Sequence, residues 1–401
     1  MCSGYNCVYI GVYYMIGNII PEAKEKPKAI REYHLGENYT GMWEKLEALI
    51  TFVVPAYNAE ATLDRTMYSI VNQSSGQWRA IIVNDGSKDA TGQIAEQYAR
   101  AYSDRVTYIE QENRGLGGAR NHGLELVQTS YVSFLDSDDW LMPDYVEKIA
   151  LALEKASEEP EMILVLPKIY HEESKVVKKW YDEDNFLTVF PEDGIIVNPA
   201  RKPLLYQFEV NQCRKILNMD FVRRIQFSFR EKVKWEDVYP HFYLFSKCTG
   251  CMGVRSVGFY YRIGSSSQIT ASHGRDRLDF MLVMRDLTSY IEQESRDDLI
   301  FPMMRVIVRF SVWCIRMADM DIRKEMVNSL HKAYVKLPAR YHRILWRKCR
   351  RQYALKDALQ YRLFWIAIRY KIFNFVFEDY LWQDVCEKTL KKLLHAENHV
   401  A

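Results

Sequence analysis

The sequence predicts an α/β protein with a mostly parallel central sheet flanked by helices, followed by a C-terminal helical extension. Between residue 50 and about residue 170, short apolar runs alternate with amphipathic segments of about a dozen residues, a pattern typical of parallel strands joined by right-handed crossovers. The apolar runs show little polar–apolar alternation, as expected of strands covered on both faces. Helical periodicity from about residue 275 onward predicts the extension.

Strands and helices are predicted to follow one another from Ile50 to Tyr170. Leu63, Met67 and Ile70 recur at helical spacing, and Pro143 suits the first position of a later helix. The predicted strands are ITFVVP, RAIIVND, VTYIEQ, YVSFLD and MILVLPKIY. The predicted helices are ATLDRTMYSIVNQ, DATGQIAEQYARAY, GARNHGLELVQ and PDYVEKIALALEKA.

The pattern is more mixed beyond residue 170. KWYDEDNFLTVFPEDG is predicted to be an irregular insertion and CRKILNMDFVRRI a helix. WEDVYPHFYLFSK opens with acids and becomes apolar, which is the pattern of a helix start. CMGVRSVGFYYRIGSSS is predicted to be a strand followed by a turn.

Composition places the 401-residue chain among ordinary soluble proteins, with 48% hydrophobic and 26% charged residues. The eight cysteines show no repeated framework, and Cys248–Cys251 lacks a second ligand pair for zinc, so a reduced, cytoplasmic compartment is expected. The apolar segment Val8–Ile20 is shorter than the roughly 20 residues of a spanning helix. It also lacks the basic start of a signal peptide, which leaves an ill-defined leader or an interfacial anchor.

Basic and aromatic residues are interleaved between Arg340 and Lys371, where ten Lys or Arg residues face one acid, Asp357. The simplest interpretation is a solvated basic face with the aromatic residues in a core. An oligomer interface, or peripheral contact with the anionic inner face of the cell membrane, is also compatible with this pattern.

Polar clusters stand where three predicted strands end. Because ligands of such sheets bind beyond the carboxyl ends of the strands, we expect Pro55–Asn58, Asn84–Gly86 and Asp136–Asp138 on one rim. Carboxylates are preferred ligands of Mg²⁺ and Mn²⁺, and the D-x-D spacing sends two of them to one side of an extended segment. A solvated acidic turn is the alternative.

A glycine-rich segment with an arginine follows the third predicted strand. Glycines 115, 117 and 118 would let backbone approach a phosphate, and Arg120 stands near a helix start, where anions bind. The spacing is not G-x-G-x-x-G and does not follow the first strand, so it is not a dinucleotide fingerprint.

Four blocks in register, FVVPAYNAE, IIVNDGSKDATGQI, ENRGLGGARNHGLE and YVSFLDSDDWLMPDY, closely resemble the family 2 glycosyltransferases, whose fold is the Rossmann-like GT-A fold. The resemblance covers residues 50 to about 150. It continues more faintly in CRKILNMDFVRRIQFSFREKVKWEDVYP and FYYRIGSSSQIT and fades after about residue 275. With the patterns above, it divides the chain into a leader (1–49), a nucleotide-sugar-binding core (50–170), an acceptor-side part of the catalytic domain (171–272) and a helical region (273–401).

The resemblance implies an inverting hexosyl- or N-acetylhexosaminyltransferase that uses Mn²⁺ or Mg²⁺. It would move a sugar from a nucleotide-diphosphate donor, such as a UDP-sugar, to a glycan or lipid-linked acceptor in polysaccharide or glycoconjugate biosynthesis of the cell envelope.

The resemblance also implies roles for individual residues. Asp237 would be the catalytic base, with Glu236 as the alternative. An acid that merely opens a helix is the structural explanation for Asp237. Asp138 would bind the metal, and Asp136 would be a second ligand or contact the donor's ribose or sugar. The resemblance places the other donor-binding residues along the nucleotide-sugar. Pro55, Tyr57, Asn58 and Glu60 would lie at the base and ribose, and Asp85 at the base. Asn113, Gly115 and Arg120 would lie along the ribose, diphosphate or sugar, Asp139 at the sugar, and Arg262 with Ser267 (or its neighbours Ser265 and Ser266) at the diphosphate.

Two other classes stay open. A sugar nucleotidyltransferase normally carries a glycine-rich, basic phosphate loop after its first strand, but PAYNAEATLD has no Lys or Arg before Arg65. A non-catalytic nucleotide-sugar-binding protein would not need Asp136, Asp138 and Asp237 together. Nucleic-acid binding is disfavoured by the donor motifs.

Overall fold

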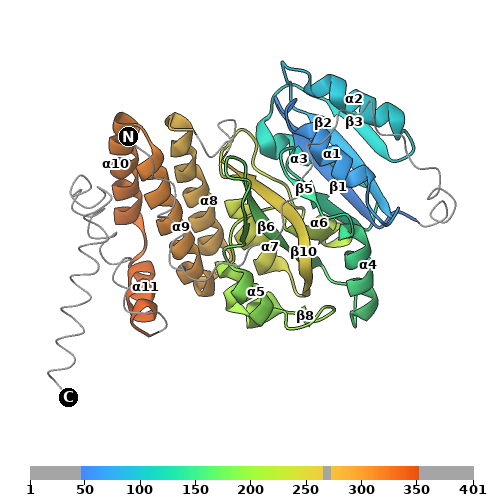
Figure 1. The fold of residues 1–401 in the computed structure, drawn as a ribbon. Helices are drawn as coiled ribbons and strands as arrows, with labels where there is room; N and C mark the ends of the chain where they lie inside the picture. The colour runs from blue at the N-terminus through green and yellow to red at the C-terminus, as the bar shows by residue number, and fades with distance from the viewer. Residues whose placement is uncertain (1–46, 265–271, 352–401) are drawn as a thin grey trace. The chain divides into compact units, whose positions relative to one another are not determined.

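The computed structural model describes residues 47–264 and 272–351 of the chain (Figure 1). They form two compact units. The first comprises residues 47–202, 211–232 and 247–264, and the second comprises residues 203–210, 233–246 and 272–351. The predictions made for residues 1–46, for Ser265 to Ser267 and for the tail beyond residue 351 lie outside the described residues.

The first unit is built on one sheet with the strand order β3-β2-β1-β4-β9-β6-β10-β5. Strands β1 to β4 pair in parallel, as do β6 and β10, whereas β9 runs antiparallel between β4 and β6. The two remaining strands, β7 and β8, pair with β6 and β10. The strands are β1 (Ile50–Ala56), β2 (Trp78–Asn84), β3 (Val106–Glu110), β4 (Tyr131–Phe134), β5 (Trp140–Leu141), β6 (Met162–His171), β7 (Val177–Lys179), β8 (Ile196–Val197), β9 (Lys215–Asn218) and β10 (Cys251–Ile263).

Helices connect and cover these strands (Figure 1). They are α1 (Leu63–Val71), α2 (Thr91–Ala101), α3 (Gly115–Glu125), α4 (Tyr145–Lys155), α5 (Glu183–Val189) and α6 (Met219–Arg224). Helix α3 packs on β1 so closely that a Cβ at Gly123 would lie 2.4 Å from a methyl carbon of Val53. The apolar face predicted for α1 is the one it buries, through Leu63, Met67 and Ile70.

The predicted α/β class and the central, mostly parallel sheet are confirmed, and every strand and helix predicted between residues 50 and 171 is present. One prediction is wrong: CRKILNMDFVRRI does not form a single helix. Its first half is strand β9, because Ile216 and Leu217 are buried between β4 and β6. Helix α6 begins only after Asn218, whose side chain accepts hydrogen bonds from the next turn.

The insertion after β6 is more regular than predicted, since it contains β7, α5 and β8. A buried ion pair joins it to the sheet. Arg214 Nη1 donates to both carboxylate oxygens of Asp182, at 3.0 and 2.8 Å, and the two side chains are 1% and 7% exposed. The pair therefore links the start of α5 to the segment that leads into β9.

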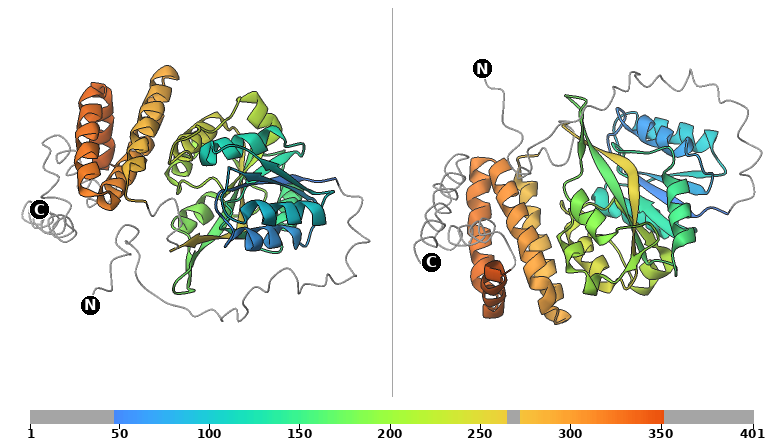
Figure 2. Two further views of the ribbon diagram at one scale, coloured as in Figure 1. Left: turned by 90° about the horizontal axis from the view of Figure 1, so that it is seen from above. Right: turned by 60° about the horizontal axis from the view of Figure 1, so that its bottom comes forward.

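The second unit is helical, as predicted for the C-terminal region. The helices beyond residue 279, drawn in shades of orange, lie side by side in both views of Figure 2. Helix α9 contacts the three other C-terminal helices. None of the helices in the described ranges is long and apolar enough to cross a membrane. The elements are η3 (Pro203–Gln207), α7 (Val238–Lys247), η5 (Arg275–Asp279), α8 (Phe280–Gln293), α9 (Asp297–Met317), α10 (Met320–Lys336) and α11 (Ala339–Arg351).

We expect Asp182→Ala to lower the free energy of unfolding by about 3–5 kcal/mol, because it leaves the buried guanidinium of Arg214 without its carboxylate. Urea denaturation of the full chain would measure this change. Asp184→Ala is the matched control, since Asp184 is 81% exposed and pairs with Lys179 on the surface. A surface pair contributes about 0–1 kcal/mol, so equal losses in the two variants would contradict the prediction.

Candidate functional site

The polar clusters predicted to share a rim do follow adjacent parallel strands, in the order β2, β1 and β4. Backbone hydrogen bonds continue past the strand ends. Asp85 N donates to Ala56 O at 2.9 Å, and Leu135 N donates to Val53 O at 3.0 Å. The segments that carry Tyr57, Asp85 and Asp136 therefore leave the sheet at the same edge.

The loops after β1 and β2 are tied together by two residues that were predicted to border the donor nucleotide. Asn58 Oδ1 accepts from Lys88 N, and Glu60 Oε2 accepts from Ala90 N, both at 2.9 Å. Pro55 lies buried within β1, whereas Tyr57 is 52% exposed. Among these residues, Tyr57 presents an aromatic ring, and Asn58 and Glu60 fix the loops beside it.

Asp85 is buried and held in one orientation. Its Oδ1 accepts from Gln111 Nε2 at 2.7 Å and from Arg114 N at 2.8 Å. The ring Nδ1 of His122 lies 2.7 Å from Gln111 Oε1. Sequence reasoning missed Gln111 and His122, although the position of Gln111 directly after β3 was a usable signal.

The glycines at the start of α3 leave room for another segment of the backbone to approach closely. A Cβ at Gly117 would lie 2.1 Å from the carbonyl oxygen of Arg230, and Gly115 has a φ of +76°. Asn113 is exposed, and its Oδ1 accepts from Gly115 N. Segment 229–232 thus lies close against these glycines, and their predicted role toward a phosphate stays a prediction.

Three aspartates follow β4, and arginines compensate their mutual repulsion. Arg120 Nη2 lies 2.7 Å from Asp136 Oδ1, and the arginine side chain is only 2% exposed. Arg262 Nη2 lies 3.3 Å from Asp138 Oδ2, and Arg262 N donates to Asp139 Oδ1 at 2.9 Å. The predicted donor residues Arg120 and Arg262 are therefore brought to the aspartate cluster from α3 and β10.

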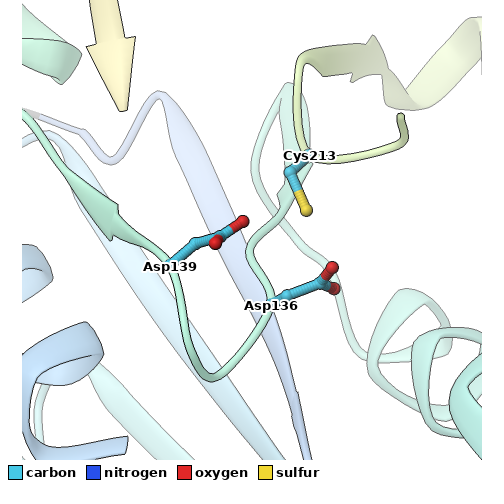
Figure 3. Close-up of side chains that lie close together, drawn as sticks. All are labelled: Asp136, Asp139 and Cys213. Atoms are coloured by element: carbon cyan, nitrogen blue, oxygen red, sulfur yellow. The ribbon is translucent and has the colours of Figure 1, made fainter. Parts of the chain in front are cut away.

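Asp136 and Asp139 also approach a cysteine that the sequence did not single out. Figure 3 shows their carboxylates and the thiol of Cys213 turned toward one another, with one potential ligand atom from each lying within 4.8 Å of the others. Asp139 Oδ2 is buried without a hydrogen-bond partner among the described residues. Two carboxylates, one of them with an unsatisfied buried oxygen, fit a divalent cation, whereas the sulfur is a softer ligand than Mn²⁺ or Mg²⁺ prefers.

Burial and crowding shift the protonation of this cluster. Burial and the nearby charge of Asp136 raise the pKa of Asp138. Burial, together with Asp138 and Asp136, raises the pKa of Asp139 well above its ordinary value. Burial likewise raises the pKa of the Cys213 thiol, which therefore stays protonated at neutral pH.

Glu236 and Asp237 precede α7 in the second unit. Glu236 is buried, whereas Asp237 is half-buried and its carbonyl accepts from His241 N at 3.1 Å. Asp237 is thus the more accessible carboxylate. Its role as base stays a prediction, and Ser267 lies outside the described residues.

Residues 51–234 match the family model described as Glycosyl transferase family 2. The chain is 46% identical over 100 residues to glycosyltransferase GlyA of Streptococcus pneumoniae, covering 25% of this chain and 14% of that protein. It is 25% identical over 236 residues to the minor teichoic acid biosynthesis protein GgaB of Bacillus subtilis, covering 58% of this chain and 25% of that protein. The chain therefore spans a quarter or less of the length of these relatives.

The fold is similar to that in the crystal structure of S. aureus TarS 1–349 in complex with UDP-GlcNAc. The TM-score is 0.57 at 16% sequence identity, and the match covers 80% of this chain and 89% of that chain. The predicted GT-A fold is confirmed.

We expect Asp139→Asn to stabilise the protein increasingly as pH rises. The folded-state pKa of Asp139 is raised, so above about pH 4 the folded protein keeps a proton that the unfolded chain has released. The contribution of Asp139 to the free energy of unfolding therefore falls as pH rises, by up to about 1.4 kcal/mol per pH unit. An asparagine has no such proton, and its amide oxygen can still accept from Arg262 N.

The measurement is the free energy of unfolding of the full chain between pH 4.5 and 7.5, in buffer with EDTA. Asp104→Asn is the control, because Asp104 is 74% exposed. A difference between Asp139→Asn and the parent chain that stayed constant with pH would contradict the prediction.

Proposed function

We propose that this chain, whose residues 51–234 match the Glycosyl transferase family 2 model, is an inverting glycosyltransferase of cell-envelope polysaccharide biosynthesis. It would transfer a hexosyl or N-acetylhexosaminyl group from a UDP-sugar to a hydroxyl of a glycan or lipid-linked acceptor. The observation that carries the proposal is the cluster of Asp136, Asp138 and Asp139 at the strand ends, flanked by Arg120 and Arg262.

The aspartate cluster would hold the divalent cation, Mn²⁺ or Mg²⁺, through Asp138 and Asp136. When bound, such a cation supplies Lewis-acid stabilisation of the departing diphosphate. Arg120 and Arg262 would add charge-assisted hydrogen bonds to the diphosphate oxygens, because both guanidinium groups already lie beside the carboxylates. Asp139 is fully buried, so we propose that its contribution to the donor sugar's position is made mainly through the loop that it anchors.

Asp85 supports uracil as the base. A carboxylate accepts hydrogen bonds, and it therefore favours a base that presents a ring N–H, as uracil does and cytosine does not. Gln111 and Arg114 hold that carboxylate at the rim where Tyr57 is exposed. The UDP-GlcNAc complex of TarS adds support for a UDP-sugar, and the name of GgaB, a minor teichoic acid biosynthesis protein, supports a role in cell-envelope polysaccharide biosynthesis.

Asp237 would take the proton of the acceptor hydroxyl as it attacks the anomeric carbon. A single base opposite the departing nucleotide gives inversion, by the logic known from glycoside hydrolysis. The exposure of Asp237 relative to Glu236 favours Asp237 for this role.

A lipid-linked acceptor would bring the enzyme to a membrane, and the basic helix α11 offers a contact for anionic lipid. The remainder of the basic aromatic segment, from residue 352 on, lies outside the described residues. Flotation of the chain with anionic liposomes, with and without residues 340–371, tests this contact. Equal recovery in the soluble fraction would rule it out.

The test of the function is release of UDP from a panel of UDP-sugars with Mn²⁺. We expect Asp237→Asn to lower turnover about 10²–10⁴-fold while UDP still binds, because only the base is lost. Asp138→Asn should lose the dependence on Mn²⁺ together with turnover. Asp220→Asn, at a carboxylate that is 91% exposed on α6, is the control.

Full turnover in both active-site variants would show that the roles are wrongly assigned. Formation of pyrophosphate from UTP and a sugar 1-phosphate would indicate a nucleotidyltransferase instead. UDP-sugar binding without UDP release, across a panel of acceptors, would indicate a binding protein.

A further inference from the structure

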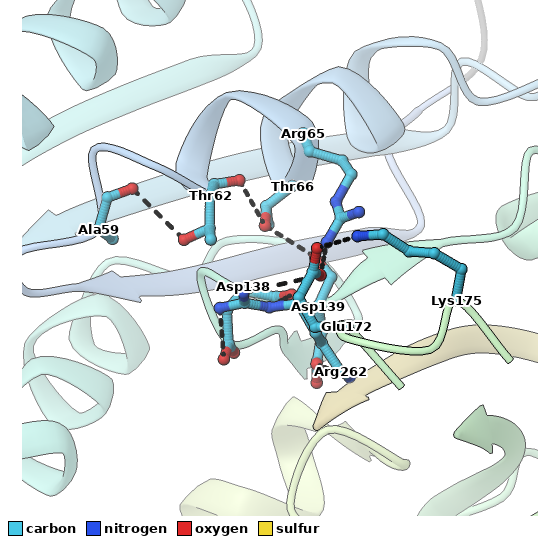
Figure 4. A network of polar contacts seen from close by, with 9 residues as sticks. All are labelled: Ala59, Thr62, Arg65, Thr66, Asp138, Asp139, Glu172, Lys175 and Arg262. Carbon is cyan, nitrogen blue, oxygen red and sulfur yellow. Dashed lines mark hydrogen bonds and ion pairs between the residues drawn. The ribbon is translucent and has the colours of Figure 1, made fainter. Parts of the chain in front are cut away.

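A glutamate outside the predicted site connects two arginines beside the aspartate cluster (Figure 4). Glu172 follows β6 directly, at the turn toward β7. Its Oε2 lies 3.8 Å from Arg65 Nη2 and 3.9 Å from Arg262 Nη1, and its Oε1 accepts from Lys175 Nζ. Three cationic groups therefore share one carboxylate.

The guanidinium of Arg262 lies close to both Glu172 and Asp138. Its side chain is 7% exposed and reaches Asp138 through two contacts, Nε to the backbone oxygen at 3.2 Å and Nη2 to Oδ2 at 3.3 Å. Its remaining terminal nitrogen, Nη1, is the one that faces Glu172. The guanidinium thus lies between a carboxylate assigned to the metal and one that is not.

Arg65 is held beside this pair by an aromatic stack. Its guanidinium carbon lies 3.7 Å from the ring centre of Trp140, and Trp140 stacks on Tyr260 at 5.2 Å with 24° between the rings. Thr66, the next residue on α1, donates to the backbone oxygen of Asp139 at 2.7 Å. Arg65 is therefore fixed to the aspartate loop.

The contact of Glu172 with the two arginines is one of charge alone. Its Oε2 is buried and has no hydrogen-bond partner among the described residues, and both guanidinium groups stand beyond hydrogen-bonding distance. Such attraction keeps Arg65 and Arg262 near each other despite their like charge. It also draws Arg262 away from Asp138, where a hydrogen bond of normal length would be shorter than 3.3 Å.

We propose that Glu172 is a positioning residue that sets the divalent-cation affinity of the aspartate cluster by restraining Arg262 from full ion pairing with Asp138. The inference rests on the proposed function, in which Asp138 is a metal ligand. Arg262 and a cation compete for the same carboxylate, so whatever holds Arg262 back favours the cation. Without the charge of Glu172, Arg262 closes on Asp138 and the cation binds more weakly.

The same change has the opposite effect on a nucleotide in the absence of metal. Removal of the glutamate charge makes the site one unit more positive and takes that carboxylate away from Arg65, so the diphosphate of UDP is attracted more strongly. A merely structural role for Glu172 would weaken both the cation and the nucleotide, because a disordered site binds neither well. A loss of cation affinity together with a gain of nucleotide affinity therefore distinguishes the positioning role from a merely structural one.

The experiment compares Glu172→Gln with the parent chain, using the full chain and two probes. Mn²⁺ alone is titrated by calorimetry without nucleotide, and UDP is titrated in EDTA. We expect Mn²⁺ affinity to fall about fivefold and metal-free UDP affinity to rise by a similar factor, the scale of a partly exposed ion pair. Glu173→Gln is the matched control, since it removes the same charge from the exposed neighbouring residue and should change either affinity less than twofold.

A second comparison, made in a chain that lacks Arg262, separates the effect that Glu172 has through Arg262 from its direct electrostatic attraction for the cation. In Arg262→Met, adding Glu172→Gln should no longer weaken Mn²⁺ binding, and the melting temperature of each variant confirms that it is folded. An equal loss in both backgrounds, or a loss of both Mn²⁺ and UDP affinity in Glu172→Gln, would overturn the proposal. If Asp138→Asn leaves Mn²⁺ affinity unchanged, the metal assignment itself fails and this inference fails with it, a result distinct from any effect of Glu172.

Discussion

The site depends on a balance of charge between three aspartates in four residues and the two arginines that meet them. Asp136, Asp138 and Asp139 leave β4 together, and burial makes their repulsion costly. Arg120 and Arg262 come from elements far apart in the sequence, α3 and β10, and each places a guanidinium against one aspartate. Asp139 is bonded by the backbone N–H of Arg262 and not by a guanidinium, and its raised pKa means that a proton neutralises it instead.

The strand topology is what makes this balance available. Strand β10 reaches the aspartate loop because it pairs in parallel with β6 and antiparallel with the short β5, which begins at Trp140 directly after the cluster. The backbone N–H of Arg262 then bonds Asp139, and its side chain bonds Asp138, so one residue of β10 fixes two residues of the loop. The pairing of β10 with β6 and β5 therefore both fixes the aspartate loop and brings the positive charge of Arg262 to it.

Local patterns are enough to predict the helices and strands between residues 50 and 171 that the sequence analysis names, and the rim where polar residues gather. Patterns fail where a distant partner decides the outcome. The helical spacing in CRKILNMDFVRRI was overridden because its first half fills a gap between β4 and β6. The glycines before Arg120 also admit the backbone of residues 229–232, and no spacing rule reveals such a neighbour. Arg65, Glu172 and Cys213 were missed for the same reason, since each gains its meaning from a contact that the fold creates.

The identity of the aspartates does not by itself fix the strength of a metal site. In the proposed site, a cation at Asp138 would compete with the guanidinium of Arg262, and the outcome would depend on what else holds the arginine. Glu172 lies on the opposite side of the guanidinium and stands at the start of an insertion with its own strands and helix. If the cluster binds a cation as proposed, changes in that insertion would alter the cation affinity while Asp136, Asp138 and Asp139 stay the same. The affinity would then depend on β6, β10 and α1 together, and residues that do not contact the metal could change it.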